Sequence, residues 1–297
     1  MTSPAAAPPT ALSPGAGVGL RLPHLAAAAA GAPLAGWVEI HPENFLANPH
    51  ARELLLAVRE RSAVSFHTVG VSAGSADGVD REHLARVAAL ARELEPFAIS
   101  GHLAWSTHRG LFLNDLLPLP YDDDTVAIVA ANVHEIQDTL GRAYLVENPA
   151  SYVALGASKL AEAEFLAELV DRTGCRLLCD VSNVHVSGSN LGYDAYAYLD
   201  AFPAHAVAEL HMGGFAAEIS GDAAGAQVLI DTHDGPIADT VLELYAHALR
   251  RFGALPTLIE WDSDLPDLAL LVNEAARADR AALGALAGPM AHVAAAR

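Results

Sequence analysis

Several apolar segments of the chain end on a histidine or a carboxylate, and these side chains bind metal ions through nitrogen and oxygen. A charge at the end of a buried segment is costly unless a metal ion or an opposite charge balances it. The chain has one lysine, Lys159, so for each carboxylate the alternatives are an arginine partner and a metal ion. The segment ends are His41, His67, His102, Glu147, Asp180, His211 and Glu260.

Asp231 and His233 form a further chelating pattern after the apolar run Val228–Ile230. Residues two apart face the same way on an extended segment, so this pair can bind one ion. The alternative is a surface turn, because Asp234-Gly235 is a turn signal. With these two residues the candidates exceed the three or four ligands of one ion, and we expect two or three ions that share a bridging carboxylate.

Strand-like and helix-like segments alternate along the chain and must position these residues. The strand-like segments are Val18–Leu22, Trp37–His41, Val64–His67, Phe97–His102, Ala143–Glu147, Arg176–Asp180, Val207–His211 and Thr257–Glu260. The helix-like segments are Pro49–Arg61, Arg81–Leu94, Asp124–Leu140, Lys159–Arg172, Tyr193–Ala201, Ala238–Phe252 and Leu265–Ala287. The first connection, Pro23–Ala35, is rich in alanine.

Eight such units predict an α/β protein with a single (β/α)8 TIM barrel over residues 17–287, since that fold takes about 250 residues. It would place the candidate ligands together at the C-terminal ends of the strands. The alternative is an open, doubly wound sheet, but neither G-x-G-x-x-G after a strand nor a phosphate-binding G-x-x-x-x-G-K-[ST] loop occurs in the sequence.

Composition restricts the partners and the compartment. The 297 residues carry a formal net charge of −19, which disfavours nucleic acid as a partner. Only Cys175 and Cys179 are present, which excludes a disulfide framework, and without a signal peptide they fit the cytoplasm. No stretch is long and apolar enough for a membrane. We expect a disordered tail over residues 1–16 and a short tail over 288–297.

Seven motifs in this order resemble those of the multinuclear non-haem iron-dependent oxidative enzymes, the family of the methanobactin-biosynthesis oxygenase, which was long an uncharacterised family. The resemblance extends from about Gly17 to about Ala282. The motifs are Glu43-Asn44, Ser65–Ser72, Gly101–Ser106, Val146–Pro149, Glu209–His211, Asp231–His233 and Ile259–Asp262.

The resemblance implies a xylose-isomerase-like barrel with two or three irons in mixed Fe(II)/Fe(III) states and O₂ as co-substrate. It also implies a ribosomally made precursor peptide as substrate, modified at cysteine, and a small partner protein that presents the leader. Glu43 and Asn44 would lie near the pocket mouth, and His108 could line the pocket. The implied ligands are His67, His102, Glu147, Asp180, Asn183, His211, Asp231, His233 and Glu260.

The chain departs from the family pattern at two places. The family commonly has Asp-x-Asn-Asn-x-Tyr where this chain has Asp180–His185, and Asn-His-Gly where this chain has Asn190-Leu191-Gly192. Whether His185 replaces a ligand or contacts the substrate stays open, as does the third metal. Two other functions also stay open: a divalent-metal isomerase or hydrolase acting on a sugar or phosphate ester, and a non-enzymatic metal-binding protein.

Overall fold

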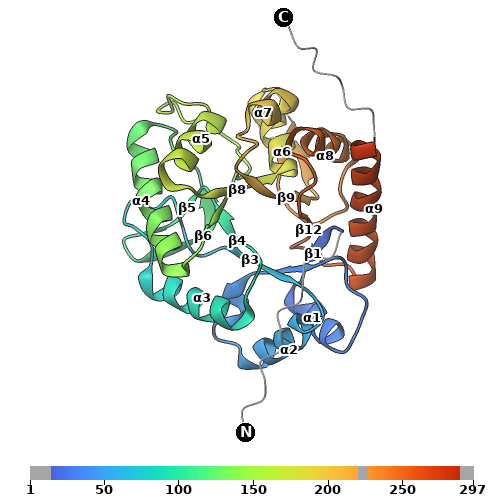
Figure 1. Ribbon diagram of the computed structural model, residues 1–297. Coiled ribbons are helices and arrows are strands. Elements are labelled where there is room, and N and C mark those ends of the chain that lie inside the picture. The colour runs from blue at the N-terminus through green and yellow to red at the C-terminus, as the bar shows by residue number, and fades with distance from the viewer. Residues whose placement is uncertain (1–14, 220–226, 288–297) are drawn as a thin grey trace, which may run out of the picture.

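Eight short parallel strands close into a barrel (Figure 1), which confirms the predicted fold class. The computed structural model describes residues 15–219 and 227–287. Around the barrel the order is β1-β2-β3-β4-β7-β8-β9-β12, and β12 pairs with β1. The strands are β1 (Gly17–Gly19), β2 (Val38–Ile40), β3 (Val64–Thr68), β4 (Ile99–His102), β7 (Leu145–Glu147), β8 (Arg176–Asp180), β9 (Val207–Gly213) and β12 (Thr257–Glu260).

Helices surround the strands on the outside (Figure 1). Several begin at an Asp or Asn side chain that accepts a backbone N–H, as Asp80 does for α3 and Asp122 for α4. The helices are α1 (Leu22–Ala29), α2 (Pro49–Arg59), α3 (Arg81–Leu94), α4 (Asp123–Leu140), α5 (Glu162–Thr173), α6 (Val181–Leu191), α7 (Ala195–Ala201), α8 (Asp239–Phe252) and α9 (Leu268–Ala287), with the 3-10 turn η1 (Pro42–Phe45).

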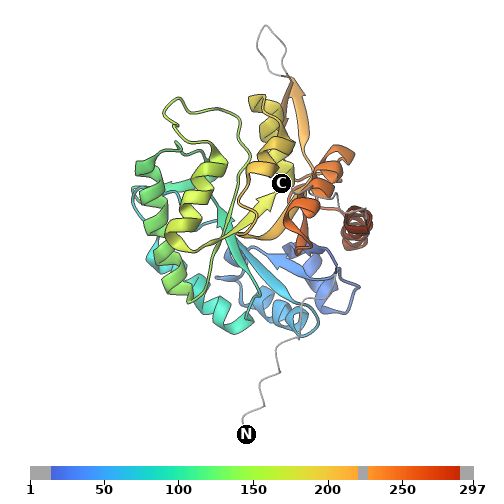
Figure 2. The same cartoon turned by 45° about the horizontal axis from the view of Figure 1, so that its top comes forward.

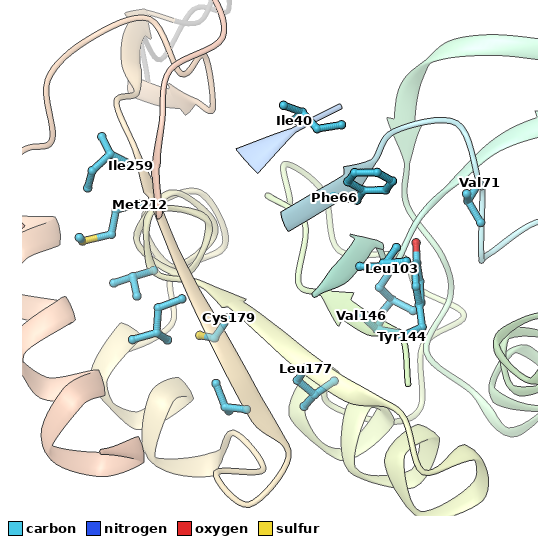
Figure 3. Packing of buried hydrophobic residues seen from close by; sticks show 14 of the residues in the cluster. Ile40, Phe66, Val71, Leu103, Tyr144, Val146, Leu177, Cys179, Met212 and Ile259 are labelled. Carbon is cyan, nitrogen blue, oxygen red and sulfur yellow. The ribbon is translucent and has the colours of Figure 1, made fainter. Parts of the chain in front are cut away.

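The main apolar core lies between the strands and the helices. Alternate strand residues face outward and are fully buried there, among them Phe66, Val146, Leu177 and Cys179 (Figure 3). At the end of the barrel where the strands begin, the rings of Trp37 and Phe97 pack edge to face, with their centroids 5.0 Å apart. The remaining alternate positions face the barrel interior, and these carry the polar residues of the candidate site.

Two β-hairpins and one helix extend the barrel beyond the predicted elements. The antiparallel hairpins are β5 (Trp105–His108) with β6 (Leu111–Leu117) and β10 (Ala216–Ile219) with β11 (Gln227–Ile230). The second projects away from the barrel (Figure 2). The helix is α6, whose first turn Asp180 caps by accepting the Asn183 N–H at 2.7 Å. No described helix has the length and hydropathy needed to cross a membrane.

The predicted tails fall mostly on residues 1–14 and 288–297, outside the described residues. The two described residues of the first tail are Gly15 and Ala16. Ala16 is buried, and its backbone N–H donates to Asp279 Oδ1 at 2.7 Å, which ties this residue to α9 just before β1.

Candidate metal centre

Three of the predicted ligands bring their donor atoms together at the ends of neighbouring strands. His67 on β3 and His102 on β4 place their Nε2 atoms 3.0 Å apart. Glu147, at the end of β7, has Oε2 3.3 Å from His67 Nε2 and 3.5 Å from His102 Nε2. Ligands about 2.1 Å from one ion lie roughly 3.0–3.4 Å from each other, so this triangle fits a single metal ion.

The hydrogen bonds of His67 direct its free nitrogen toward that triangle. Ser100 Oγ donates to the Phe66 carbonyl, so it accepts from His67 Nδ1 at 2.8 Å. The proton is therefore on Nδ1, and Nε2 presents a lone pair. Burial lowers the pKa of His67 well below its usual value and that of His102 to about 4, so both rings are neutral at pH 7.

A second set of donors shares Glu147 with the first. Glu147, Asp180 of β8, His211 of β9 and Glu260 of β12 each offer an atom within 4.8 Å of the others. His211 Nδ1 lies 3.1 Å from Glu260 Oε2. Burial raises the pKa of Glu147 well above its usual value and that of Asp180 to about 6. Glu147 belongs to both sets, so any ions that the two sets held would share this carboxylate.

Two asparagines connect the strand ends beside these carboxylates. Asn148 accepts the Asp180 backbone N–H at 2.9 Å and donates to the Asp180 carbonyl at 3.1 Å, which joins the ends of β7 and β8. Asn183, in the first turn of α6, donates to the Asn148 carbonyl at 3.1 Å and to Glu147 Oε1 at 3.4 Å. Its Oδ1 is buried, with no hydrogen-bond partner in the described chain.

Asp231 and His233 converge by a different geometry from the one predicted. His233 has φ = 46°, so the segment is not extended, yet its Nε2 lies 2.8 Å from Asp231 Oδ1. The loop closes over Gly213, where a Cβ would come within 2.2 Å of the His233 ring. Both residues line the same pocket as His67 and Glu260.

Sequence reasoning missed two buried carboxylates below the predicted ligands. Glu39 Oε2 and Glu209 Oε1 each lie 3.4 Å from His211 Nε2, and Ser65 Oγ donates to Glu39. Burial raises the pKa of Glu209 to about 7. Both stand two residues before a histidine that ends a predicted strand, and this period-two spacing was the available signal. Their carboxylates hold His211 with Nδ1 toward Glu260.

Arg21, which was also missed, occupies one edge of the centre. It donates to Asp262 Oδ1 at 2.5 Å and to Glu260 Oε1 at 3.4 Å, and Gly19 leaves room for its guanidinium. His41 Nε2 lies 3.9 Å from Asp262 and 4.0 Å from Glu260. The guanidinium already neutralises this edge, so the donors of His67 and His211 are the better ion sites.

The charge balance of the barrel interior fits bound cations. All the carboxylate residues that are buried in the described chain lie there, whereas Arg21 is the one buried arginine or lysine among those residues. Several donor atoms are buried without a hydrogen-bond partner, including Glu147 Oε2, Asp180 Oδ2 and His233 Nε2. Such groups are costly unless metal ions satisfy them. The buried carboxylates are Glu39, Glu147, Asp180, Glu209 and Glu260.

The pocket above the centre has a volume of about 330 Å³ and is walled on one side by β6 residues Phe112–Leu116. Four residues were predicted to contact the substrate: Glu43, Asn44, His108 and His185. Among the described residues, none of these four lines the pocket. Glu43 accepts the Val69 and Gly70 N–H groups, and Asn44 is exposed.

The two histidines of that group lie at the periphery. His108 pairs with Asp77 at 3.2 Å on the exposed hairpin, and His185 packs against Phe215 at 5.0 Å between ring centroids. Substrate binding by the four residues stays a prediction.

Solved structures share the fold of this chain. An L-ribulose 3-epimerase aligns with a TM-score of 0.58 at 16% identity, covering 91% of this chain and 96% of the other. A xylose isomerase-like TIM barrel protein from Mycobacterium smegmatis in complex with magnesium aligns with a TM-score of 0.54 at 14% identity, covering 84% and 85%. At these identities the similarity establishes the xylose-isomerase-like barrel and nothing about the reaction.

Sequence relatives extend over nearly the whole chain. The UPF0276 protein of Caulobacter sp. (strain K31) is 48% identical over 269 residues, 90% of this chain and 96% of the relative. A UPF0276 protein of Bordetella parapertussis is 45% identical over 278 residues, 93% and 96%. Residues 15–283 match the family described as RiPP precursor modification enzyme MbnB/TglH/ChrH. The chain therefore belongs to this family of enzymes that modify ribosomally made precursor peptides.

Proposed function

We propose that the protein is a multinuclear non-haem iron enzyme that uses O₂ to modify a precursor peptide, at a cysteine of that peptide. The observation that carries the proposal is the pair of donor sets joined by Glu147 in a family of peptide-modifying enzymes. Mixed imidazole and carboxylate donors suit iron, and Fe(II) with such ligands leaves positions open for O₂. When bound, the irons would supply the oxidation of the peptide.

The residues of the chain have separable tasks in this proposal. His67, His102 and Glu147 would hold one ion, and Asp180, His211 and Glu260 a second with Glu147 between them. Asp231 and His233 could complete the second site or hold a third ion, with Asn183 as a weaker ligand. The low pKa values of His67 and His102 keep their nitrogen lone pairs free for the metal at pH 7.

The peptide would enter over β6, whose side chains Leu111, Phe112 and Leu116 are exposed beside the pocket. Apolar residues at a pocket mouth favour a protein or peptide ligand. We further propose that a small partner protein presents the leader of that peptide. Two buried, unbridged cysteines, Cys175 and Cys179, support activity in the cytoplasm.

The test is metal analysis and turnover of the purified protein. After anaerobic loading with Fe(II), we expect about two or three irons per chain, and O₂-dependent mass change in a co-encoded cysteine-containing peptide. Less than one iron per chain and no reaction with such a peptide would refute the proposal. Activity with zinc or manganese in the absence of O₂ would instead support an isomerase or hydrolase.

A further inference from the structure

A second pocket lies outside the barrel, where the segment before α4 and the loop from β7 to α5 meet α7. Its volume is about 430 Å³, and apolar residues such as Leu119, Val153, Leu160 and Ala197 form most of its wall. The loop from β7 also links it to the metal centre, since Tyr152 Oη accepts the Asp231 N–H at 3.1 Å. The two pockets therefore share one segment of chain.

Glu162 and three tyrosines provide polar groups to this pocket, whose wall also includes Asp194, the residue that caps α7. Glu162, the first residue of α5, accepts a hydrogen bond from Tyr121 Oη at 3.1 Å. Tyr198 Oη is buried beside the Glu162 carboxylate, and the hydroxyls of Tyr121 and Tyr198 both act to lower the pKa of that carboxyl. The ring of Tyr193 stacks on that of Tyr198, with centroids 5.5 Å apart and planes 20° apart.

Glu162 lacks a counter-charge. None of the ion pairs within residues 15–219 and 227–287 includes it, whereas Glu168 on the same helix pairs with Arg172 at 2.8 Å. Lys159 is exposed and meets Tyr121 only through its backbone N–H. Burial raises the pKa of Glu162 to about 7. A cation that entered the pocket would therefore neutralise a carboxylate that the fold leaves unbalanced.

We propose that this pocket binds a primary alkylammonium group, such as the end of a lysine side chain on a substrate peptide. The apolar wall accommodates the methylene chain. An ammonium group has three N–H donors, and the Glu162 carboxylate and the hydroxyl oxygens of Tyr121 and Tyr198 are acceptors for them. Aromatic rings also attract cations. The peptide as source rests on the proposed function, but the alkylammonium chemistry does not.

The test is calorimetric titration of the full chain, without metal, with n-pentylammonium chloride and with n-pentanol. We expect the ammonium ion to bind at least tenfold more tightly than the alcohol of equal length. Glu162→Gln should weaken ammonium binding at least tenfold, whereas Glu168→Gln, an exposed control on the same helix, should leave it unchanged. Equal binding of the two probes, or full ammonium binding by the Glu162→Gln variant, would overturn the proposal.

A second variant keeps the test decisive if Glu162→Gln does not fold. Ala197→Phe places a ring in the pocket from an exposed position of α7 and should abolish ammonium binding; retained affinity would contradict the assignment.

To identify the source of the ammonium group, the binding of Nα-acetyl-lysine methylamide is compared with that of its norleucine analogue. Binding of the lysine compound supports a peptide, and binding of pentylammonium alone supports a free amine. No metal, O₂ or peptide turnover is needed, so failure here would be distinct from failure of the proposed function.

Discussion

Glu147 is the single residue on which both donor sets depend. Glu147→Gln keeps the shape of the side chain but removes the negative charge that two cations would share. We expect the iron content after anaerobic loading to fall by at least one ion per chain, measured by mass spectrometry of the metal. Loss of a hydrogen-bonding partner of a metal ligand typically costs about 10–100-fold in affinity or activity, and removing the charge of a shared ligand should lower peptide oxidation at least as much.

The exposed Glu168→Gln serves as the matched control and should load as the wild type does. Because burial raises the pKa of Glu147, the uncharged glutamine should not destabilise the metal-free fold. Full iron content in Glu147→Gln would remove the bridging role that we assign to this carboxylate.

Glu162 predicts a stability that depends on pH. Its carboxyl has a pKa of about 7 in the folded chain against an ordinary value of 4.5. From pH 4.5 to 7 the unfolded chain loses this proton while the folded chain retains it, so the folded state is progressively disfavoured as pH rises. The free energy of unfolding of Glu162→Gln minus that of the wild type should therefore be more positive at pH 8 than at pH 4.5. We expect this change to be roughly 1–3 kcal/mol.

Urea denaturation of metal-free protein at the two pH values measures this difference. The exposed Glu168→Gln controls for the loss of one negative charge and should show no comparable change. An equal effect of Glu162→Gln at both pH values would mean that the folded chain does not retain this proton above pH 4.5.

The structure brings the candidate ligands together where they end apolar runs, whereas the polar residues deeper in the strands were not predicted. His67, His102, Glu147 and Asp180 end apolar runs, so the sequence alone placed them at one rim of the barrel. Glu39 and Glu209 lie inside strands, where alternation with apolar neighbours disguised them. Arg21 was missed because its partners are about 240 positions away in the chain.

At the level of elements, Gly213 shows why the last residue of β9 must be small. A methyl group there would meet the His233 ring at 2.2 Å, so Gly213→Ala should displace this candidate ligand. We expect the loss of up to one ion per chain and a destabilisation of about 1–3 kcal/mol, as for other overpacked sites.

Gly235→Ala is the matched control, since a Cβ at Gly235 has no heavy atom within 4 Å and its backbone is not left-handed. Metal analysis and thermal unfolding of both variants make the comparison. Wild-type metal content in Gly213→Ala would show that His233 is not a ligand.

The hairpin β5–β6 yields a prediction about the substrate. Phe112 is 56% exposed and lines the pocket above the metal centre. Phe112→Ala should raise KM for the peptide several-fold while iron content and thermal stability stay unchanged, because an exposed ring contributes little to the fold. Ile128→Ala on α4, exposed but outside this pocket, is the control for steady-state kinetics. An unchanged KM for Phe112→Ala would exclude the hairpin from peptide binding.

The eight strands could be predicted because most are short runs buried at every position, and most helices because their buried residues recur with the helical period. The helix α6 could not, since Ser182, Ser187, Gly188 and Asn190 are poor helix formers and tertiary burial overrides their preferences. The hairpin β5–β6 was also missed. Its second strand, Leu111–Leu117, is mostly exposed and has no alternation of buried and exposed residues to detect.

For the whole molecule, the buried charge predicts that metal ions stabilise the fold. The barrel interior holds five buried carboxylates, Glu39, Glu147, Asp180, Glu209 and Glu260, against one buried arginine, Arg21, in the described chain. Ions that bind only the folded state stabilise it by about 2.7 kcal/mol at 100 times the Kd. With an unfolding entropy of about 2.1 cal/mol/K per residue, each kcal/mol raises the Tm of a chain of this size by about 1.5–2 °C, so Fe(II) should raise it by roughly 4–5 °C.

Calorimetry under anaerobic conditions, with and without Fe(II), measures this shift. A chelator should reverse it, and Glu147→Gln should reduce it because one variant residue weakens both donor sets. If Fe(II) left the Tm unchanged at concentrations that load the protein, the buried carboxylates would have to be neutralised by protons rather than by metal. The high pKa of Glu147 and the values of about 6 for Asp180 and about 7 for Glu209 make protonation the competing state, and the Tm shift decides between them.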